Sequence, residues 1–165
     1  MTRMRLAKKT RVTANGTKVI TAKLVAAPEL EWRLQAAAVR RLRDMPTYCA
    51  TMPDGGALPR GAFTIAADFN AARRSAQEAV KAKATGIAAG EPDLRIYLFG
   101  GRPGLIEFKA ERGRLSKEQI ARHALLEALG YRVKVIRAST EWGCADAAEA
   151  VVWGWLGLAS SVSAA

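Results

Sequence analysis

Apolar residues along the chain recur either every three to four positions or at every second position, and these two periods predict its secondary structure. We expect helices at about residues 28–43, 70–84, 116–129 and 140–158, and strands at 62–67, 93–99, 105–110 and 132–136. With the second helix treated as an insertion, the order is αβββαβ. This order predicts an α/β fold with a mixed sheet flanked by helices.

The first predicted helix carries an apolar stripe, and one acid shares its side. Leu34, Ala38 and Leu42 recur at helical spacing. Glu31 falls on the same side of the helix, whereas Glu29 falls nearly opposite. A carboxylate that points toward a core needs a partner or a metal, so Glu31 is a candidate metal ligand. The alternative for Glu31, as for Glu29, is a favourable charge at the helix N-terminus.

The helix expected at 116–129 begins with a capping box. In the pattern Ser116-x-x-Gln119, the serine and the glutamine satisfy backbone N–H groups of the first turn. Gly130 is expected to end the helix. The apolar spacing predicts a buried face made of Ile120, Ala124, Leu125, Ala128 and Leu129.

Two acids and a lysine fall on the predicted hairpin of residues 93–110. Asp93 opens the first strand, and the second strand places Glu107 and Lys109 on one face. Two carboxylates beside a lysine can hold Mg²⁺ and orient a nucleophilic water, so the hairpin indicates a nuclease active site. The alternatives are that Asp93 caps a turn, and that Glu107 and Lys109 form an ion pair on an exposed sheet.

The positive charge of the chain is concentrated near its N-terminus. The 165 residues carry a net charge of +11. Residues 1–45 contain eleven Lys or Arg and three acids, and the remainder contains fifteen and twelve. Residues 1–27 form a basic arm, either with short strands at Val19-Ile20-Thr21 and Lys23-Leu24-Val25 near the turn dipeptide Asn15-Gly16, or as a flexible DNA-binding segment. This arm favours a polyanionic partner over a surface that is basic for solubility alone.

Several functional classes are disfavoured by the composition. We find no apolar run of transmembrane length and no signal peptide, which predicts a cytoplasmic protein without a membrane partner. Cys49 and Cys144 have no metal-ligand spacing and are expected to be free thiols in a reducing compartment. A single histidine, His123, argues against a zinc site. It lies one turn beyond Gln119 and could approach the same site, but we expect it on a helix surface or at an interface.

The hairpin and its flanks resemble the VRR-NUC domain, a branch of the PD-(D/E)XK nuclease superfamily. The resemblance rests on Lys83 to Leu94, Leu105-Ile106-Glu107-Phe108-Lys109, Gly113 to Gln119 and Leu129-Gly130-Tyr131. Residues 28–43 and 63–74 are similar to the upstream half of short standalone members from phages and bacteria. The resemblance covers most of residues 28–140 and implies a restriction-endonuclease-like core, and we place the nuclease domain at 28–158. It covers neither the arm at 1–27 nor the C-terminal helix with Trp153 and Trp155. These two residues belong to the core or to a dimer contact, and residues 159–165 are expected to form a frayed tail.

The resemblance also implies roles for individual residues. Asp93 and Glu107 would ligate Mg²⁺ or Mn²⁺, together with the backbone carbonyl of Phe108. Glu31 would complete the metal site from the first helix. Lys109 would position or activate the attacking water and offset charge on the phosphorane.

Further residues around this centre have alternative assignments. Gln119 would orient Lys109 or the scissile phosphate, although the capping box explains it nearly as well. Glu91 is a weaker alternative to Asp93 as a metal acid. Contact with DNA phosphates, or a solvated helix face, is expected of Asn70, Arg73, Arg74 and Lys83.

The function implied by the resemblance is a metal-dependent, structure-selective DNA endonuclease in a bacterial or phage-infected cell. Related standalone domains resemble Holliday-junction resolving enzymes, which act as homodimers so that two sites cut symmetric strands. The alternatives are a nuclease acting on flapped or linear duplex DNA, and a non-catalytic nucleic-acid-binding module of the same fold.

Overall fold

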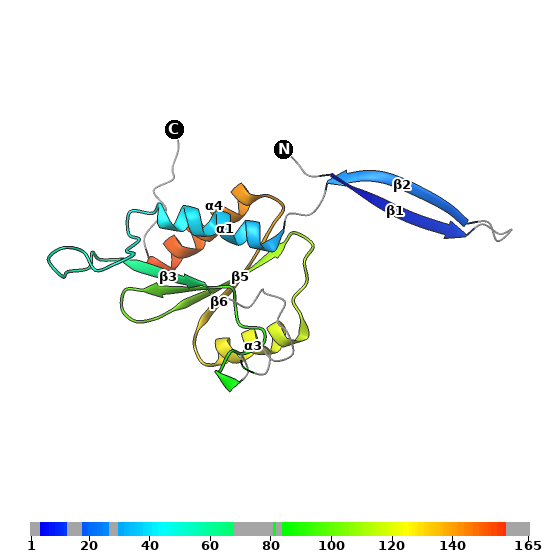
Figure 1. The fold of residues 1–165 in the computed structure, drawn as a ribbon. Helices are drawn as coiled ribbons and strands as arrows, with labels where there is room; N and C mark the ends of the chain where they lie inside the picture. The colour runs from blue at the N-terminus through cyan, green and yellow to red at the C-terminus, as the bar shows by residue number, and fades with distance from the viewer. Residues whose placement is uncertain (1–3, 13–17, 27–29, 68–80, 82–83, 158–165) are drawn as a thin grey trace.

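The computed structural model describes residues 4–12, 18–26, 30–67, 81 and 84–157 of the chain. Figure 1 shows its elements, which are β1 Met4–Val12, β2 Lys18–Ala26, α1 Glu31–Arg43, β3 Phe63–Ala67, β4 Leu94–Leu98, β5 Gly104–Ala110, α3 Lys117–Ala128, β6 Arg132–Ala138 and α4 Glu141–Leu156. From α1 to β6 these elements follow the predicted αβββαβ order. The helix predicted at 70–84 falls almost wholly outside the described residues.

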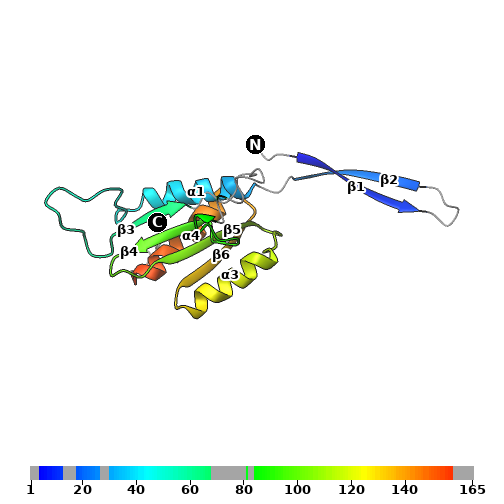
Figure 2. The same cartoon turned by 60° about the horizontal axis from the view of Figure 1, so that its bottom comes forward.

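One four-stranded sheet forms the centre of the α/β domain. Its strand order is β3-β4-β5-β6, with antiparallel pairs up to β5 and a parallel pair between β5 and β6. Figures 1 and 2 show α1 and α4 on one face of this sheet and α3 on the other. The mixed sheet flanked by helices is therefore confirmed.

The basic arm contains a separate antiparallel hairpin. β1 pairs with β2 along nine residues, from Met4 opposite Ala26 to Val12 opposite Lys18. Figures 1 and 2 show this hairpin standing away from the four-stranded sheet. β2 is one continuous strand through both segments for which short strands were considered, and the predicted turn at Asn15-Gly16 lies outside the described residues.

The core lies between the sheet and the layer formed by α1 and α4. Leu34, Ala38 and Leu42 are fully buried, as their spacing predicts. They belong to one apolar cluster with Phe108 of β5 and Val152 of α4. The first helix begins at Glu31, later than the expected start near residue 28. Pro28 and Glu29, which were expected in its first turn, lie outside the described residues.

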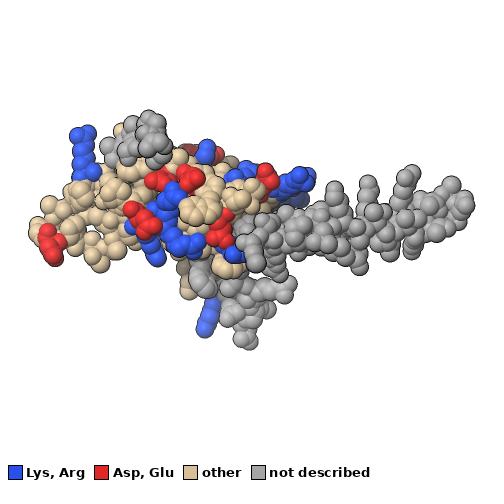
Figure 3. Space-filling view, turned by 90° about the horizontal axis from the view of Figure 1, so that it is seen from above, with Lys and Arg blue, Asp and Glu red and all other residues tan. Residues whose placement is uncertain are grey.

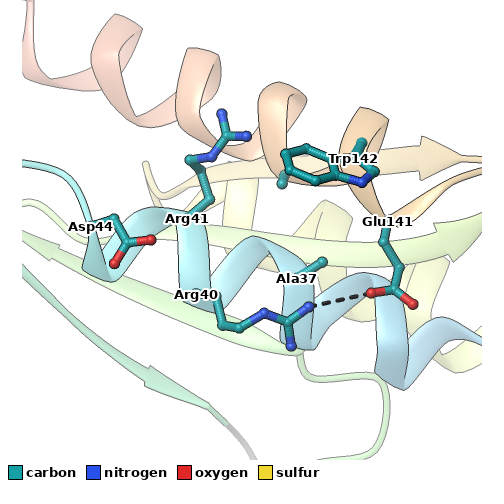
Figure 4. A pocket seen from close by; sticks show the side chains of 7 residues that line it. Ala37, Arg40, Arg41, Asp44, Glu141 and Trp142 are labelled. Atoms are coloured by element: carbon teal, nitrogen blue, oxygen red, sulfur yellow. Dashed lines mark hydrogen bonds and ion pairs between the residues drawn. The ribbon is translucent and has the colours of Figure 1, made fainter.

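Charged residues tie α1 to α4 along the outer surface. The guanidinium of Arg41 lies 2.8 Å from carboxylate oxygens of both Asp146 and Glu149. Glu141 accepts from Arg40 at 3.3 Å, a contact drawn in the pocket of Figure 4. Figure 3 shows acidic and basic residues interspersed over this face. These arginines of α1 are therefore balanced by acids of α4.

The predicted buried face of α3 is wrong. Only His123 and Leu126 of this helix are buried, whereas the five predicted residues Ile120, Ala124, Leu125, Ala128 and Leu129 are all exposed. The helix is rotated so that the stripe of Gln119, His123 and Leu126 turns toward the sheet. A polar contact made by Gln119, described below, accounts for this rotation.

The terminal helix places its tryptophans in the core layer. Trp153 and Trp155 pack, partly buried, against the apolar cluster. Trp155 lies directly over Gly104 at the start of β5, where an added Cβ would overlap its ring. This packing supports the core interpretation of both residues. Gly104 is required here because a larger residue would push α4 off the sheet.

Both cysteines are described in the structure, and neither is in a disulfide. Cys49 and Cys144 are both free thiols, and burial raises the pKa of Cys144 to about 11. Within the described ranges, we find no helix long and apolar enough to cross a membrane.

Candidate active site

Four elements deliver polar residues to one end of the central strand β5. Glu107 and Lys109 come from β5 itself, and Asp93 lies one residue before β4 rather than within it. Glu31 is the first residue of α1. Gln119 lies in the first turn of α3. Because β4 and β5 are neighbours with α1 and α3 on opposite faces, residues distant in the sequence meet at this point.

Lys109 lies between two carboxylates. Its Nζ is 2.5 Å from Oε1 of Glu107 and 3.3 Å from Oε2 of Glu31. Glu107 is completely buried, whereas about half of the Glu31 side chain is exposed. The expectation that Glu31 turns toward the hairpin is therefore met by this contact.

The pKa values of Glu107 and Lys109 are set by their burial and by the contact between them. Burial raises the pKa of Glu107 to about 7, against the opposing effect of Lys109. Burial alone lowers the pKa of Lys109, but the hydrogen bond to Glu107 and the charges of Glu107 and Glu31 outweigh it, so the pKa is raised. Lys109 is consequently a cation at neutral pH, and Glu107 is a carboxyl group near its midpoint.

Gln119 completes the capping box and also contacts Glu107, the partner of Lys109. Its Oε1 accepts from the backbone N–H of Ser116 at 3.0 Å, which completes the capping box. Its Nε2 donates to Oε1 of Glu107 at 2.6 Å. One amide group therefore caps α3 and fixes that helix against the carboxylate of Glu107, so the two interpretations are compatible.

Asp93 is held in place by two backbone contacts. Its Oδ2 accepts from the N–H of Phe108 at 2.8 Å, and its backbone carbonyl accepts from Nε2 of Gln35 at 3.2 Å. Gln35 thus connects α1 to the loop that carries Asp93. Its signal in the sequence is its position four residues after Glu31, on the same side of the helix.

The loop before Asp93 is pressed against the start of α3. Gly90 has φ of +78°, and a Cβ there would lie 2.5 Å from the carbonyl carbon of Glu118. Next to it, Glu91 accepts from Arg122 at 2.7 Å and from Arg95 at 3.3 Å. Glu91 is therefore engaged by two arginines that anchor the loop, which argues against it as a metal acid.

His123 is buried at this centre, so its expected place on a helix surface is wrong and the alternative, an approach to the site, is the one observed. It is only 6% exposed, and its Nε2 lies 3.7 Å from Oε2 of Glu107. These two buried atoms have no hydrogen-bond partner among the described residues. Burial lowers the pKa of His123, which favours the neutral imidazole. The signal was its position one turn after Gln119, on the face that contacts Glu107.

Comparison with known families assigns the chain. The model of the VRR-NUC domain matches residues 29–140, which is more than half of the sequence. The chain belongs to the VRR-NUC domain family. Comparison with the curated proteins and with the solved structures gave no match. Membership confirms the resemblance and implies a nuclease-type function that acts on nucleic acid.

The matched region of the VRR-NUC domain contains the whole centre described above. It begins before Glu31 and ends after β6, so it includes all the polar residues that converge on β5. The β1–β2 hairpin precedes it. The DNA-contacting residues expected of this domain, namely Asn70, Arg73, Arg74 and Lys83, lie outside the described residues.

Other basic residues surround the centre of the VRR-NUC domain. Arg112, Arg114 and Lys117 are exposed between β5 and the first turn of α3. Arg137 of β6 pairs in register with Lys109, and its Nε donates to the carbonyl of Gly113 at 3.4 Å. The centre therefore has cations on its solvent side that a phosphate backbone can contact.

The donor set of the VRR-NUC centre fits a hard divalent cation. Carboxylates of Asp93, Glu107 and Glu31 are the ligand type that Mg²⁺ and Mn²⁺ prefer. Oε2 of Glu107 is buried and without a hydrogen-bond partner among the described residues. The side chains are not yet arranged as a metal site, because no three His, Cys, Asp or Glu side chains among the described residues lie close enough together to hold an ion. The ammonium of Lys109 lies where the charges of Glu107 and Glu31 converge.

Proposed function

We propose that the protein is an endonuclease that hydrolyses DNA phosphodiesters with Mg²⁺ or Mn²⁺. The observation that carries the proposal is the position of Lys109, a buried ammonium held between the carboxylates of Glu107 and Glu31. A lysine buried with two acids, in a domain of a nuclease family, is suited to act on an anionic reaction centre.

The metal would be held by Asp93 and Glu107, with the backbone carbonyl of Phe108 and with Glu31. A bound divalent cation lowers the pKa of a water and stabilises charge on the phosphoryl oxygens. The chain itself supplies orientation. The hydrogen bond from Phe108 to Asp93 fixes that carboxylate, and Gln119 fixes Glu107.

Lys109 would act on the charge that develops during hydrolysis. Its raised pKa keeps the ammonium protonated at neutral pH, so it can donate hydrogen bonds to water or to a phosphoryl oxygen. Gln119 limits where Glu107 can move, and Glu107 in turn limits Lys109. In this arrangement Gln119 is a positioning residue.

We further propose that branched DNA, including the Holliday junction, is the substrate and that the protein acts as a homodimer. Support comes from the resemblance to standalone junction-resolving members and from exposed cations, which suit recognition by shape and phosphate contacts. Exposed apolar residues Ile120, Leu125 and Leu129 on α3 give a second copy a surface to cover. Flapped or linear duplex DNA is the alternative substrate.

A cleavage panel tests this function. Purified protein with Mn²⁺ or Mg²⁺ is given a four-way junction, a flap, a splayed arm and a linear duplex. We expect cutting of the junction, and a loss of about 100-fold or more in Asp93→Asn and Lys109→Met. Asp54→Asn and Lys134→Met make the same chemical changes at exposed positions outside the centre and should cut normally. Undiminished cutting by the first pair would refute the site.

The competing class is a nucleic-acid-binding module that has kept the nuclease fold without catalysis. The intact set of Asp93, Glu107 and Lys109 argues against it, because binding alone has no need for buried carboxylates. Calorimetric titration with Mn²⁺ separates the two classes. Binding by the wild type that is lost in Asp93→Asn supports the nuclease, whereas no binding in either supports the module.

A further inference from the structure

The register of the β1–β2 hairpin sorts its basic residues onto one face. Residues directly opposite each other in an antiparallel pair lie on the same face, and successive residues alternate between faces. One face therefore comprises Arg5, Ala7, Lys9 and Arg11 of β1 with Val19, Thr21, Lys23 and Val25 of β2. It contains four cations, and residues 1–28 contain no acid at all.

The opposite face has a different composition. It comprises Met4, Leu6, Lys8, Thr10 and Val12 of β1 with Lys18, Ile20, Ala22, Leu24 and Ala26 of β2. Most of these residues are apolar, and the two cations are Lys8 at the middle of the hairpin and Lys18 in its last pair. The hairpin is thus a two-sided ribbon with one cationic face and one largely apolar face.

This ribbon pairs with no third strand among the described residues. A lone two-stranded hairpin is only marginally stable in water, so a ribbon of nine pairs gains from a partner. Figures 1 and 2 show it extending beyond the α/β domain, on the side where α1 begins and brings Glu31 to the active site. A partner that reaches both the ribbon and this site must be extended.

We infer that the cationic face of the β1–β2 ribbon lies along duplex DNA next to the cleavage site, an inference that rests on the proposed function. The ribbon is about 30 Å long at roughly 3.4 Å per residue, which is close to one turn of the double helix. Residues two apart on this face, such as Lys9 and Arg11, are about 7 Å apart along the strand, twice the roughly 3.4 Å axial spacing of phosphates. A two-stranded ribbon also fits the major groove.

The two faces allow a charge-matched test. Lys9→Gln with Lys23→Gln removes two charges from the cationic face, and Lys8→Gln with Lys18→Gln removes two from the other. Both pairs are made in full-length protein carrying Asp93→Asn, and the dissociation constant for a labelled linear duplex is measured at several salt concentrations. The first pair should weaken binding about tenfold at 0.15 M salt and lower the salt slope by about 1.8, because each phosphate contact contributes about 0.9. The second pair should change the dissociation constant and the salt slope by no more than about a third of these amounts.

Equal effects of the two pairs would overturn the inference, because they would show a diffuse charge effect without a contacting face. No effect of the first pair, or preference of the wild type for anionic lipid vesicles over the duplex, would overturn it as well. The proposed function is read separately, with Asp93 intact. The protein with Lys9→Gln and Lys23→Gln should still cut DNA at a saturating concentration and low salt. If the wild type does not cut but its DNA binding depends on the cationic face, the nuclease function is refuted and the inference about the ribbon stands.

Discussion

The burial of Glu107 predicts that this carboxyl group makes the metal-free protein less stable as the pH rises. Glu107 is fully buried on β5, and burial raises its pKa from 4.5 to about 7. A carboxyl group with a raised pKa binds its proton more tightly in the folded than in the unfolded protein. Its contribution to stability is therefore complete below pH 4.5 and is lost as the pH rises through 7. We expect Glu107→Gln, which stays neutral, to abolish this loss.

The magnitude follows from the two pKa values. Each pH unit between 4.5 and about 7 is worth about 1.4 kcal/mol, so the full effect is about 3 kcal/mol. Most domains have free energies of unfolding of about 5–15 kcal/mol, so this is a large share. The glutamine keeps an oxygen that can accept from Lys109 and Gln119, so the loss of the carboxylate is the principal change.

Urea unfolding in EDTA at pH 5, 6, 7 and 8 measures the effect. The free energy of unfolding of Glu107→Gln minus that of the wild type should rise by about 2–3 kcal/mol from pH 5 to pH 8. Glu111→Gln, which removes an exposed carboxylate just beyond β5, controls for the change in net charge. A difference that does not vary with pH would refute the reasoning, because it would mean that Lys109 keeps Glu107 ionised throughout.

Three further predictions concern the same centre. Gly90→Ala should lower the free energy of unfolding, measured in urea, by about 2 kcal/mol more than Gly86→Ala, since both have positive φ but only the first Cβ meets backbone. His123→Leu should leave the metal-free melting temperature unchanged or higher, because an unpaired imidazole is removed, and should weaken calorimetric Mn²⁺ binding about tenfold while His123→Gln binds nearly normally. Saturating Mn²⁺ should raise the melting temperature of the wild type, and EDTA should reverse the rise, whereas Asp93→Asn should show no such shift.

Local patterns predicted the sheet and the first helix well, and they predicted the third helix poorly. The stripe of Leu34 and Leu42 is the only strongly apolar side of α1, so its period identifies the buried face. On α3, the stripe through Ile120 and Leu125 is more apolar than the one that is buried. What orients α3 is the contact of Gln119 with Glu107, which depends on the position of a distant strand and has no periodic signal.

The convergence of the candidate site residues was predictable where they lie close together in the sequence. Alternation along β5 places Glu107 and Lys109 on one face, and helical geometry turns Glu31 to the core side of α1. Their meeting depends on the strand order, which puts β5 beside β4 and beneath α1. The burial of His123 was not expected, because a lone histidine in a helix is most simply explained as a surface residue, and it follows from the rotation of α3.

The contacts of α1 make the delivery of Glu31 depend on residues far from the active site. Glu31 is half-exposed, and its ion pair with Lys109 holds only the first turn of α1. The last turns of that helix are held by Arg41, which pairs with acids of α4, and by the apolar cluster below. Because α4 in turn rests on β5 through the contact of Trp155 with Gly104, both ends of the strand that carries Glu107 and Lys109 contribute to the position of α1. The terminal helix, although remote from the candidate active site, therefore belongs to the framework that brings Glu31 to Lys109.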